Sequence, residues 1–318
     1  MNKALPKVSV VTITYGHEKY ITETLDGVLM QQYQGPVELI IANDNSPDAT
    51  DEVVKKYFSE NPAPENFEIK YTKHDTNKGM MPNFIWALEQ ATGEYIALCE
   101  GDDYWIDPLK LQKQIDFLES NMKCVFVFTA AISLRGDMEE EYFSNKLFIP
   151  GLVSKSLFLQ NGGANFATAS VVFKNVVLQP IPPFFSKATA GDMLLALLAV
   201  TKGEIGFISN KTTVYRQMAN NSWTSNLTYE KYVEHYFKGQ SLLKEFDQYS
   251  GNQYTEITDM LRKSYTTHYI YFQIIHLPVL ESFKVLLTNL SFFNNKSYNK
   301  KLMKTFLWRI IKRRKILS

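Results

Sequence analysis

The sequence lacks a strong excess of charge of either sign: 34 lysines and arginines oppose 33 acidic residues among 318, which leaves a net charge of +1. Because nucleic-acid binding depends on an electropositive surface, the overall charge does not favour a nucleic-acid partner. Cysteine is also scarce. Cys99 and Cys124 lie in or at the start of apolar runs, which indicates buried thiols rather than a disulfide framework.

Two kinds of hydrophobic segment and two phosphate-binding motifs are missing as well. Residues 1–7 contain no apolar core of a signal peptide, and no charge-free apolar run reaches the length of a membrane span. We therefore expect a cytoplasmic protein. The first apolar run is not followed by G-x-G-x-x-G, and G-x-x-x-x-G-K-[ST] occurs nowhere, so the loops of dinucleotide oxidoreductases and P-loop enzymes are absent.

What is present, in the first hundred residues, is an alternation of β-branched apolar runs with segments of helical periodicity. The expected strands are 8–14, 37–42, 67–71 and 95–99. Such alternation predicts an α/β fold with a mainly parallel sheet flanked by helices, in which ligands bind at the carboxyl ends of the strands.

The later chain is less regular. We expect strands at 125–131, 167–173, 205–208 and 212–215, a helix at 191–200 and a charged loop at 135–145. The pattern becomes helical after about residue 220. We therefore predict a domain at 1–224 and a helical C-terminal region at 225–318.

The stretch Tyr95–Pro108 carries three carboxylates, Glu100, Asp102 and Asp103, directly after an expected strand. Clustered acids raise one another's pKa unless a positive group lies among them, and carboxylate oxygens suit Mg²⁺ or Mn²⁺. The other interpretation is a solvated acidic turn before a helix that Asp107 caps. Polar residues also follow the first two strands, at the same expected sheet edge, which favours a ligand site.

Four motifs together resemble inverting family 2 glycosyltransferases of the bacterial surface-polysaccharide type, which have the GT-A, Rossmann-like fold. They are S-V-V-T-I-T-Y at 9–15, N-D-N-S-P-D-A-T at 43–50, N-K-G at 77–79 and Y-I-A-L-C-E-G-D-D-Y-W at 95–105. The resemblance covers residues 6–224. It implies a nucleotide-sugar donor, often a UDP-sugar, a divalent cation, and transfer to an acceptor hydroxyl with inversion.

The resemblance assigns roles to the residues around the nucleotide. Thr14 and Tyr15 match the first-strand loop that contacts it, and Lys78 lies in a flanking loop. Asp44 matches an acid that binds the base, although Asn43 and Asn45 replace the family's aspartate and glycine beside it. A turn-stabilising role is the alternative for Asp44.

The acidic stretch and a later aspartate match the catalytic positions. Glu100-Gly101-Asp102 occupies the place of the D-x-D motif, so Asp102 and Glu100 are the expected metal ligands, and Asp103 is expected near the donor sugar. Asp192 aligns with the catalytic base. Its alternative role is a helix cap.

Three further residues have two interpretations each. Arg216 contacts a phosphate or forms a surface ion pair, Trp105 lines the sugar sites or packs in the core, and Thr168 binds the acceptor or donor sugar or has no such role. The family often places a metal-binding histidine where this chain has Met218, and a thioether is a poor ligand for Mg²⁺ or Mn²⁺. We expect the five histidines to be structural, because no pair has ligand spacing.

The end of the chain, residues 299–317, predicts a basic amphipathic helix with Trp308. Such a helix suits an anionic membrane surface, and packing against the catalytic domain is the alternative. Membrane contact fits a glycan acceptor that is lipid-linked, and predicts a peripheral location on the inner face of the cell membrane.

Two rival functions follow from the same residues. Met218 and Glu100 favour a catalytically impaired scaffold that binds nucleotide-sugar or glycan at the membrane. A nucleotidyltransferase requires a glycine-rich basic loop after the first strand, and residues 12–18 do not form one.

Overall fold

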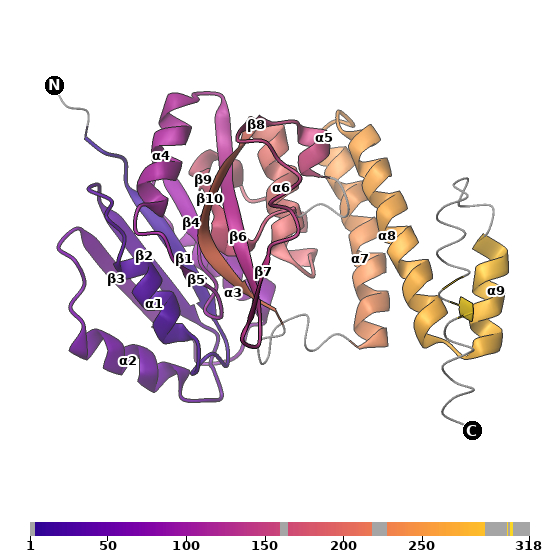
Figure 1. Ribbon diagram of the computed structural model, residues 1–318, viewed down its shortest axis with the longest axis horizontal. Helices are drawn as coiled ribbons and strands as arrows, with labels where there is room; N and C mark the ends of the chain where they lie inside the picture. The colour runs from indigo at the N-terminus through magenta and orange to yellow at the C-terminus, as the bar shows by residue number, and fades with distance from the viewer. Residues whose placement is uncertain (1–3, 160–164, 218–227, 290–303, 305, 308–318) are drawn as a thin grey trace. The chain divides into compact units, whose positions relative to one another are not determined.

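The computed structural model describes residues 4–159, 165–217, 228–289, 304, 306 and 307 (Figure 1). The chain divides into two compact units, Met1–Asn226 and Leu227–Ser318. Met218 lies outside the described residues. The predicted amphipathic helix at 299–317 also lies outside them, apart from residues 304, 306 and 307.

The first unit is built on one 10-stranded sheet in the order β3-β2-β1-β4-β9-β6-β10-β5, with β7 paired to β6 and β8 to β10. Its strands are β1 Val8–Thr14, β2 Val37–Asn43, β3 Phe67–Lys73, β4 Tyr95–Leu98, β5 Tyr104–Trp105, β6 Cys124–Arg135, β7 Met138–Glu141, β8 Gly151–Val153, β9 Val171–Lys174 and β10 Glu204–Arg216. Strands β1 to β4 are mutually parallel, β9 runs against β4 and β6, and β10 is parallel to β6. The predicted α/β fold with a mainly parallel sheet is confirmed.

Helices flank this sheet (Figure 1). They are α1 Ile21–Leu29, α2 Thr50–Glu60, α3 Met80–Glu89, α4 Lys110–Ser120, α5 Lys155–Phe158 and α6 Gly191–Lys202. Helices α1, α2 and α4 share one buried cluster with alternate residues of β1, β2 and β4. Helices α3 and α6 contact the sheet but contribute nothing to that cluster, which places them on the other face.

Three local predictions are wrong in whole or in part. The strand expected at 167–173 begins only at Val171, after a short 3₁₀ helix at Thr168–Ser170. The charged stretch 135–145 is not a loop throughout: β6 continues to Arg135, the chain turns at Gly136 with φ of 59°, and β7 pairs back. The two short strands expected at 205–208 and 212–215 are one strand, β10. Its register shifts between Ile208 and Thr213, where exposed polar residues interrupt the apolar pattern.

The second unit consists, where described, of α7 Tyr229–Tyr249, α8 Thr255–His276 and α9 Val279–Asn289. Its small core joins Ile270 and Ile274 of α8 to Leu286 of α9 and to Phe306. Within the described residues, no helix has the length and hydrophobicity that crossing a membrane requires.

Candidate active site

The acidic stretch forms the connection between β4 and β5, at the carboxyl end of the parallel strands. Beyond the ladder of β1 and β4, the Cys99 N–H donates to the Val11 carbonyl (3.1 Å) and the Gly101 N–H to the Ile13 carbonyl (3.0 Å). The Asp103 N–H then donates to the Glu100 carbonyl (3.0 Å) and closes a turn. Pairing with β1 therefore carries the carboxylates to the sheet edge where β1 ends.

Glu100 lies among other acids. Burial, together with the charges of Asp102 and Asp192, raises the pKa of its carboxyl to about 8, and a hydrogen bond with the Thr168 side chain opposes the rise. Asp192 and Thr168 come from distant segments, the first turn of α6 and the short 3₁₀ helix η2 Thr168–Ser170. The fold thus brings four predicted site residues together.

Asp103 is almost fully buried, with 1% of its surface exposed. Its Oδ1 accepts the Arg216 N–H at 2.8 Å, whereas its Oδ2 has no protein partner. Burial and the neighbouring Asp102 and Glu100 raise the pKa of Asp103 well above its ordinary value. Excess negative charge is the dominant electrostatic feature of this edge.

Thr14 and His17 enclose Gly101. A Cβ atom on Gly101 would lie 2.7 Å from Thr14 Oγ1 and 2.9 Å from His17 Nδ1, so a larger residue does not fit there. Among the described residues, four buried side-chain polar atoms lack a partner: Thr12 Oγ1, Thr14 Oγ1, His17 Nδ1 and Asp103 Oδ2. Buried polar atoms are rarely left unpaired. Three of these four border the acidic connection, which indicates a place for a polar ligand.

His17 was not singled out from the sequence. It follows the first loop as a lone histidine without ligand spacing, and only its packing against Gly101 marks it. Burial lowers the pKa of its imidazole, and the nearby Asp102 charge acts in the opposite direction. We therefore treat His17 as neutral near pH 7.

Asp44 connects the loops that follow β2 and β3. Its N–H donates to the Thr14 carbonyl (3.0 Å), and its two carboxylate oxygens accept the N–H groups of Lys78 (2.7 Å) and Gly79 (2.9 Å). The turn-stabilising bond belongs to the preceding residue, because Asn43 Oδ1 accepts the Ser46 N–H. The side chains of Tyr15 and Lys78 are exposed on these loops.

Asp192 lies in the first turn of α6, next to Gly191, whose Cβ position is filled by the Phe84 ring at 2.7 Å. The Asp192 carboxylate accepts the Met193 N–H at 2.7 Å. Burial raises the pKa of this carboxyl above its ordinary value. The residue therefore bonds the start of the helix, and its charge also raises the pKa of Glu100.

The contacts of Trp105 and Arg216 bear on the two interpretations of each residue. Trp105 is 2% exposed and its indole N–H donates to the Ala169 carbonyl (2.8 Å), which favours the core interpretation. The Arg216 guanidinium donates to the Asp102 carbonyl (2.7 Å) and pairs with the Glu23 carboxylate. A phosphate contact would require it to exchange Glu23 for the phosphate.

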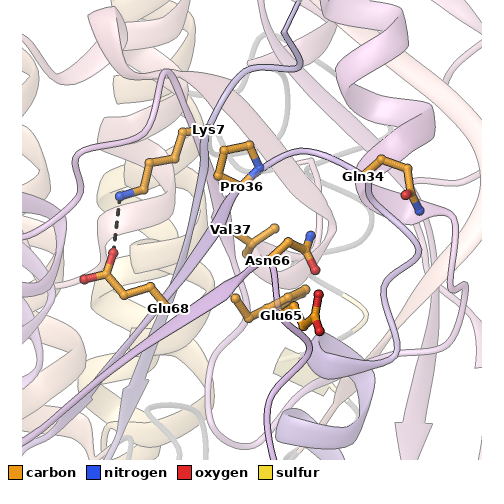
Figure 2. A pocket seen from close by; sticks show the side chains of 8 residues that line it. Lys7, Gln34, Pro36, Val37, Glu65, Asn66 and Glu68 are labelled. Carbon is orange, nitrogen blue, oxygen red and sulfur yellow. Dashed lines mark hydrogen bonds and ion pairs between the residues drawn. The ribbon is translucent and has the colours of Figure 1, made fainter.

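A surface hollow lies away from the acidic connection between β4 and β5, at the amino ends of β1, β2 and β3 (Figure 2). It is lined by Lys7, Gln34, Pro36, Val37, Glu65, Asn66, Phe67 and Glu68. Strands of seven residues separate the two ends by about 20 Å. The hollow is therefore not part of the candidate site.

Comparison with known proteins places this geometry in context. The family model "Glycosyl transferase family 2" matches residues 9–174. An uncharacterized protein of Mycobacterium tuberculosis is 34% identical over 231 residues, which are 70% of this chain and 62% of that relative. The chain thus spans less than two thirds of that relative's length.

The name of another relative gives a specific activity. The Escherichia coli protein WfaP, a UDP-Glc:alpha-D-GlcNAc-diphosphoundecaprenol beta-1,3-glucosyltransferase, is 26% identical over 224 residues, covering 69% of this chain and 80% of its own.

Solved structures share the fold. Staphylococcus aureus TarS 1-349 in complex with UDP-GlcNAc matches with a TM-score of 0.57 and 18% identity, over 97% of this chain and 92% of its own. The mannosyltransferase PcManGT from Pyrobaculum calidifontis, in complex with GDP-Man and Mn²⁺, gives 0.57 and 17%, over 97% and 86%. These likenesses establish the GT-A fold.

Proposed function

The chain belongs to glycosyl transferase family 2, and from this premise we propose that it transfers a sugar from a nucleoside diphosphate sugar, of the UDP type, to an acceptor hydroxyl, with inversion. The acceptor is a glycan or a lipid-linked saccharide. One observation carries the proposal: Glu100, Asp102 and Asp103 meet Asp192 at the carboxyl edge of the sheet, beside unpaired polar atoms of Thr14 and His17. Ligands of open α/β sheets bind at this edge.

The nucleotide would lie across the loops that follow β1, β2 and β3. We assign its contacts to Thr14, Tyr15, Asp44 and Lys78. The bonds from Asp44 to the Lys78 and Gly79 amides support this assignment, because they hold two of these loops in one arrangement. Each carboxylate oxygen retains a second lone pair for a ligand.

The residues fit a divalent cation, which we take to be Mg²⁺ or Mn²⁺. Burial and, after it, repulsion from neighbouring acids raise the pKa of Glu100 and Asp103, and a cation would relieve the repulsion. No three acids, histidines or cysteines converge as a complete metal cluster within the described part of the chain, so Asp102 and Glu100 would share the ion with the diphosphate and water. When bound, the ion would stabilise charge on the departing diphosphate.

Asp192 is the proposed base. Its carboxylate would take the proton of the acceptor hydroxyl as the acceptor oxygen bonds to the anomeric carbon and the bond to the diphosphate breaks. The raised pKa of Asp192 suits a base, because it increases the affinity of the carboxylate for that proton. Asp103 and Thr168 would lie near the donor sugar or the acceptor, next to Glu100 and Asp192.

The lipid-linked acceptor is supported by WfaP, whose name gives a diphosphoundecaprenol-linked sugar as its acceptor. Residues 290–318 contain nine lysines and arginines and no acid. The basic sequence 299–317 within this stretch therefore supports contact with an anionic membrane surface. A location at the inner face of the cell membrane would follow.

The test is a thermal-shift screen of UDP, GDP and their sugar derivatives, each with and without Mn²⁺, followed by a donor-hydrolysis assay. A ligand that binds the native state raises the unfolding temperature. We expect a UDP-sugar with Mn²⁺ to give the largest rise and to be hydrolysed. No shift with any nucleotide would contradict the proposal, and a shift without hydrolysis or transfer would favour the nucleotide-sugar-binding scaffold.

A further inference from the structure

The Asp102 carboxylate has no hydrogen-bond donor or ion-pair partner among the described residues, whereas Glu100 bonds the Thr168 side chain and Asp103 Oδ1 accepts the Arg216 N–H. The protein therefore constrains this carboxylate only through the main chain of Asp102, which sets the position of its Cβ atom and the rotamers it can adopt. That main chain is held from one side by Arg216, whose Nη1 donates to the Asp102 carbonyl at 2.7 Å. The Arg216 N–H also donates to Asp103 Oδ1 at 2.8 Å.

Arg216 is itself held by the surrounding side chains. Its guanidinium lies 4.4 Å from the centre of the Tyr104 ring and 5.1 Å from that of Tyr20, and the side chain is only 10% exposed. Cation–π attraction of this kind stabilises a guanidinium that lies above the face of an aromatic ring. The remaining contact is the ion pair between Nη2 and Glu23, a residue of α1 whose side chain is 55% exposed.

Among the described residues, Glu23 is the only anionic side chain paired with this guanidinium, whose other hydrogen bond goes to the Asp102 carbonyl. The bond to Asp103 Oδ1 comes from the Arg216 main-chain N–H and not from the guanidinium. A guanidinium that is largely removed from water needs a compensating charge. Glu23 therefore keeps Arg216 in place, and Arg216 in turn fixes the peptide that carries Asp102. Three segments distant in sequence, α1, the acidic connection and the end of β10, meet in this arrangement.

We propose that Glu23 and Arg216 are positioning residues that together orient the Asp102 carboxylate toward a divalent cation. The inference rests on the proposed function, since it concerns the cation of that same site. Neither side chain is a ligand. The pair acts through the main chain of Asp102, as outer groups around metal sites commonly orient the ligands themselves.

The test measures the Mn²⁺ concentration that gives half of the thermal stabilisation at a fixed concentration of UDP, in the full chain. The variants are Glu23→Gln, Arg216→Lys, Arg216→Met and the double variant Glu23→Gln/Arg216→Met. Loss of an orienting partner weakens metal binding by about 10- to 100-fold, which is the increase we expect for Arg216→Met. Glu23→Gln should give a smaller increase, and stabilisation by UDP without metal should stay at the wild-type level.

The double variant separates a positioning pair from two independent effects. If Glu23 acts only through Arg216, removing Glu23 changes nothing further once Arg216 is methionine. Additive effects would contradict the pair. Arg262→Met is the matched control, because Arg262 pairs with Asp247 and Asp259 in the helical unit, and its loss should lower stability without changing the Mn²⁺ midpoint.

The outcomes distinguish the two proposals. A wild-type protein that shows no stabilisation by UDP and Mn²⁺ overturns the proposed function and the inference with it. A wild-type response that all the Glu23 and Arg216 variants reproduce overturns the inference alone. If Arg216→Met does not fold, Arg216→Lys and Glu23→Gln decide, since the first keeps the charge and the second changes a half-exposed side chain.

Discussion

Glu100 shows how burial and like charge act on a single carboxyl group. Burial removes this carboxyl from water, and its neighbours Asp102 and Asp192 are negative. Together they raise the pKa of Glu100 to about 8. Without a cation, the native state retains a proton between pH 4.5 and 8 that the unfolded chain has released. The native state binds more protons over this range, so the contribution of Glu100 to stability falls as the pH rises.

Glu100→Gln should therefore stabilise the metal-free protein, and more so at pH 8.5 than at pH 5.5. The glutamine keeps an oxygen that accepts the Thr168 hydrogen bond, and it carries no charge to oppose Asp102. We expect an unfolding temperature about 2–4 °C higher for each 1 kcal/mol gained in a unit of this size. Thermal melts in EDTA at the two pH values measure the effect, and an identical pH dependence in variant and wild type would contradict it.

Asp192→Asn isolates the proposed base at the same scale. The amide oxygen can still accept the Met193 N–H, so the start of α6 and the binding of UDP with Mn²⁺ should be preserved. Transfer should fall by about 10²- to 10⁴-fold, because the amide cannot take the acceptor proton. Initial rates at saturating donor provide the measurement.

The matched control is Asp107→Asn. Asp107 belongs to the same stretch, but it accepts the Leu109 N–H at the start of α4 and pairs with Lys113. We expect it to change stability and leave the transfer rate unaltered. A near wild-type rate for Asp192→Asn would show that another group is the base.

At the scale of elements, the site depends on loops that are joined to one another. Gly16 donates its N–H to Ser46 Oγ (3.0 Å) and His17 donates its N–H to Thr50 Oγ1 (3.0 Å), which connects the loops after β1 and β2. Asp44 extends this connection to the loop after β3. The loops are therefore expected to respond together to loss of any of these bonds.

Asp44→Ala should release the loop at Lys78 and Gly79. The Lys78 N–H loses its acceptor, and the Gly79 N–H keeps only its bond to Asn77 Oδ1. Loss of an acceptor costs about 1–3 kcal/mol when the donor is buried. Hydrogen exchange at residues 74–79 should increase, and nucleotide binding should weaken. Asn77→Ala is the control: it removes one exposed bond to the Gly79 N–H and leaves the Asp44 carboxylate in place. Equal exchange in the two variants would contradict the role of Asp44.

The errors of sequence-based prediction also belong to this scale. Nearly continuous apolar runs identified β1, β2 and β4, because these strands are buried on both faces. The hairpin of β6 and β7 escaped because the four residues of β7 are exposed, and no apolar alternation marks them. In β10, exposed residues at the register shifts concealed a continuous strand.

At the scale of the whole molecule, the residues of the candidate site all lie in the unit Met1–Asn226. The described core of the other unit, around Leu286, shares no residue with the core of the sheet. A chain ending at residue 226 should therefore still be stabilised by UDP with Mn²⁺.

The same prediction can be checked in the full chain. Leu286→Ala removes a buried side chain from the helical unit and should cost about 2–5 kcal/mol there. The rise in unfolding temperature of the sheet unit with UDP and Mn²⁺ should remain unchanged. A loss of that rise in both the shortened chain and Leu286→Ala would mean that the site needs the helical unit.

The sequence by itself determined the alternation of strands and helices, the sheet edge at which we propose that ligands bind, and the acids expected there. These follow from periodicity and from motifs, which are local properties of the chain. Only the tertiary structure decided that Thr14 and His17 enclose Gly101, that Trp105 is buried, and that Glu23 reaches Arg216. Such contacts join residues up to 193 positions apart, and pairing over that distance depends on how the elements pack rather than on any pattern within them.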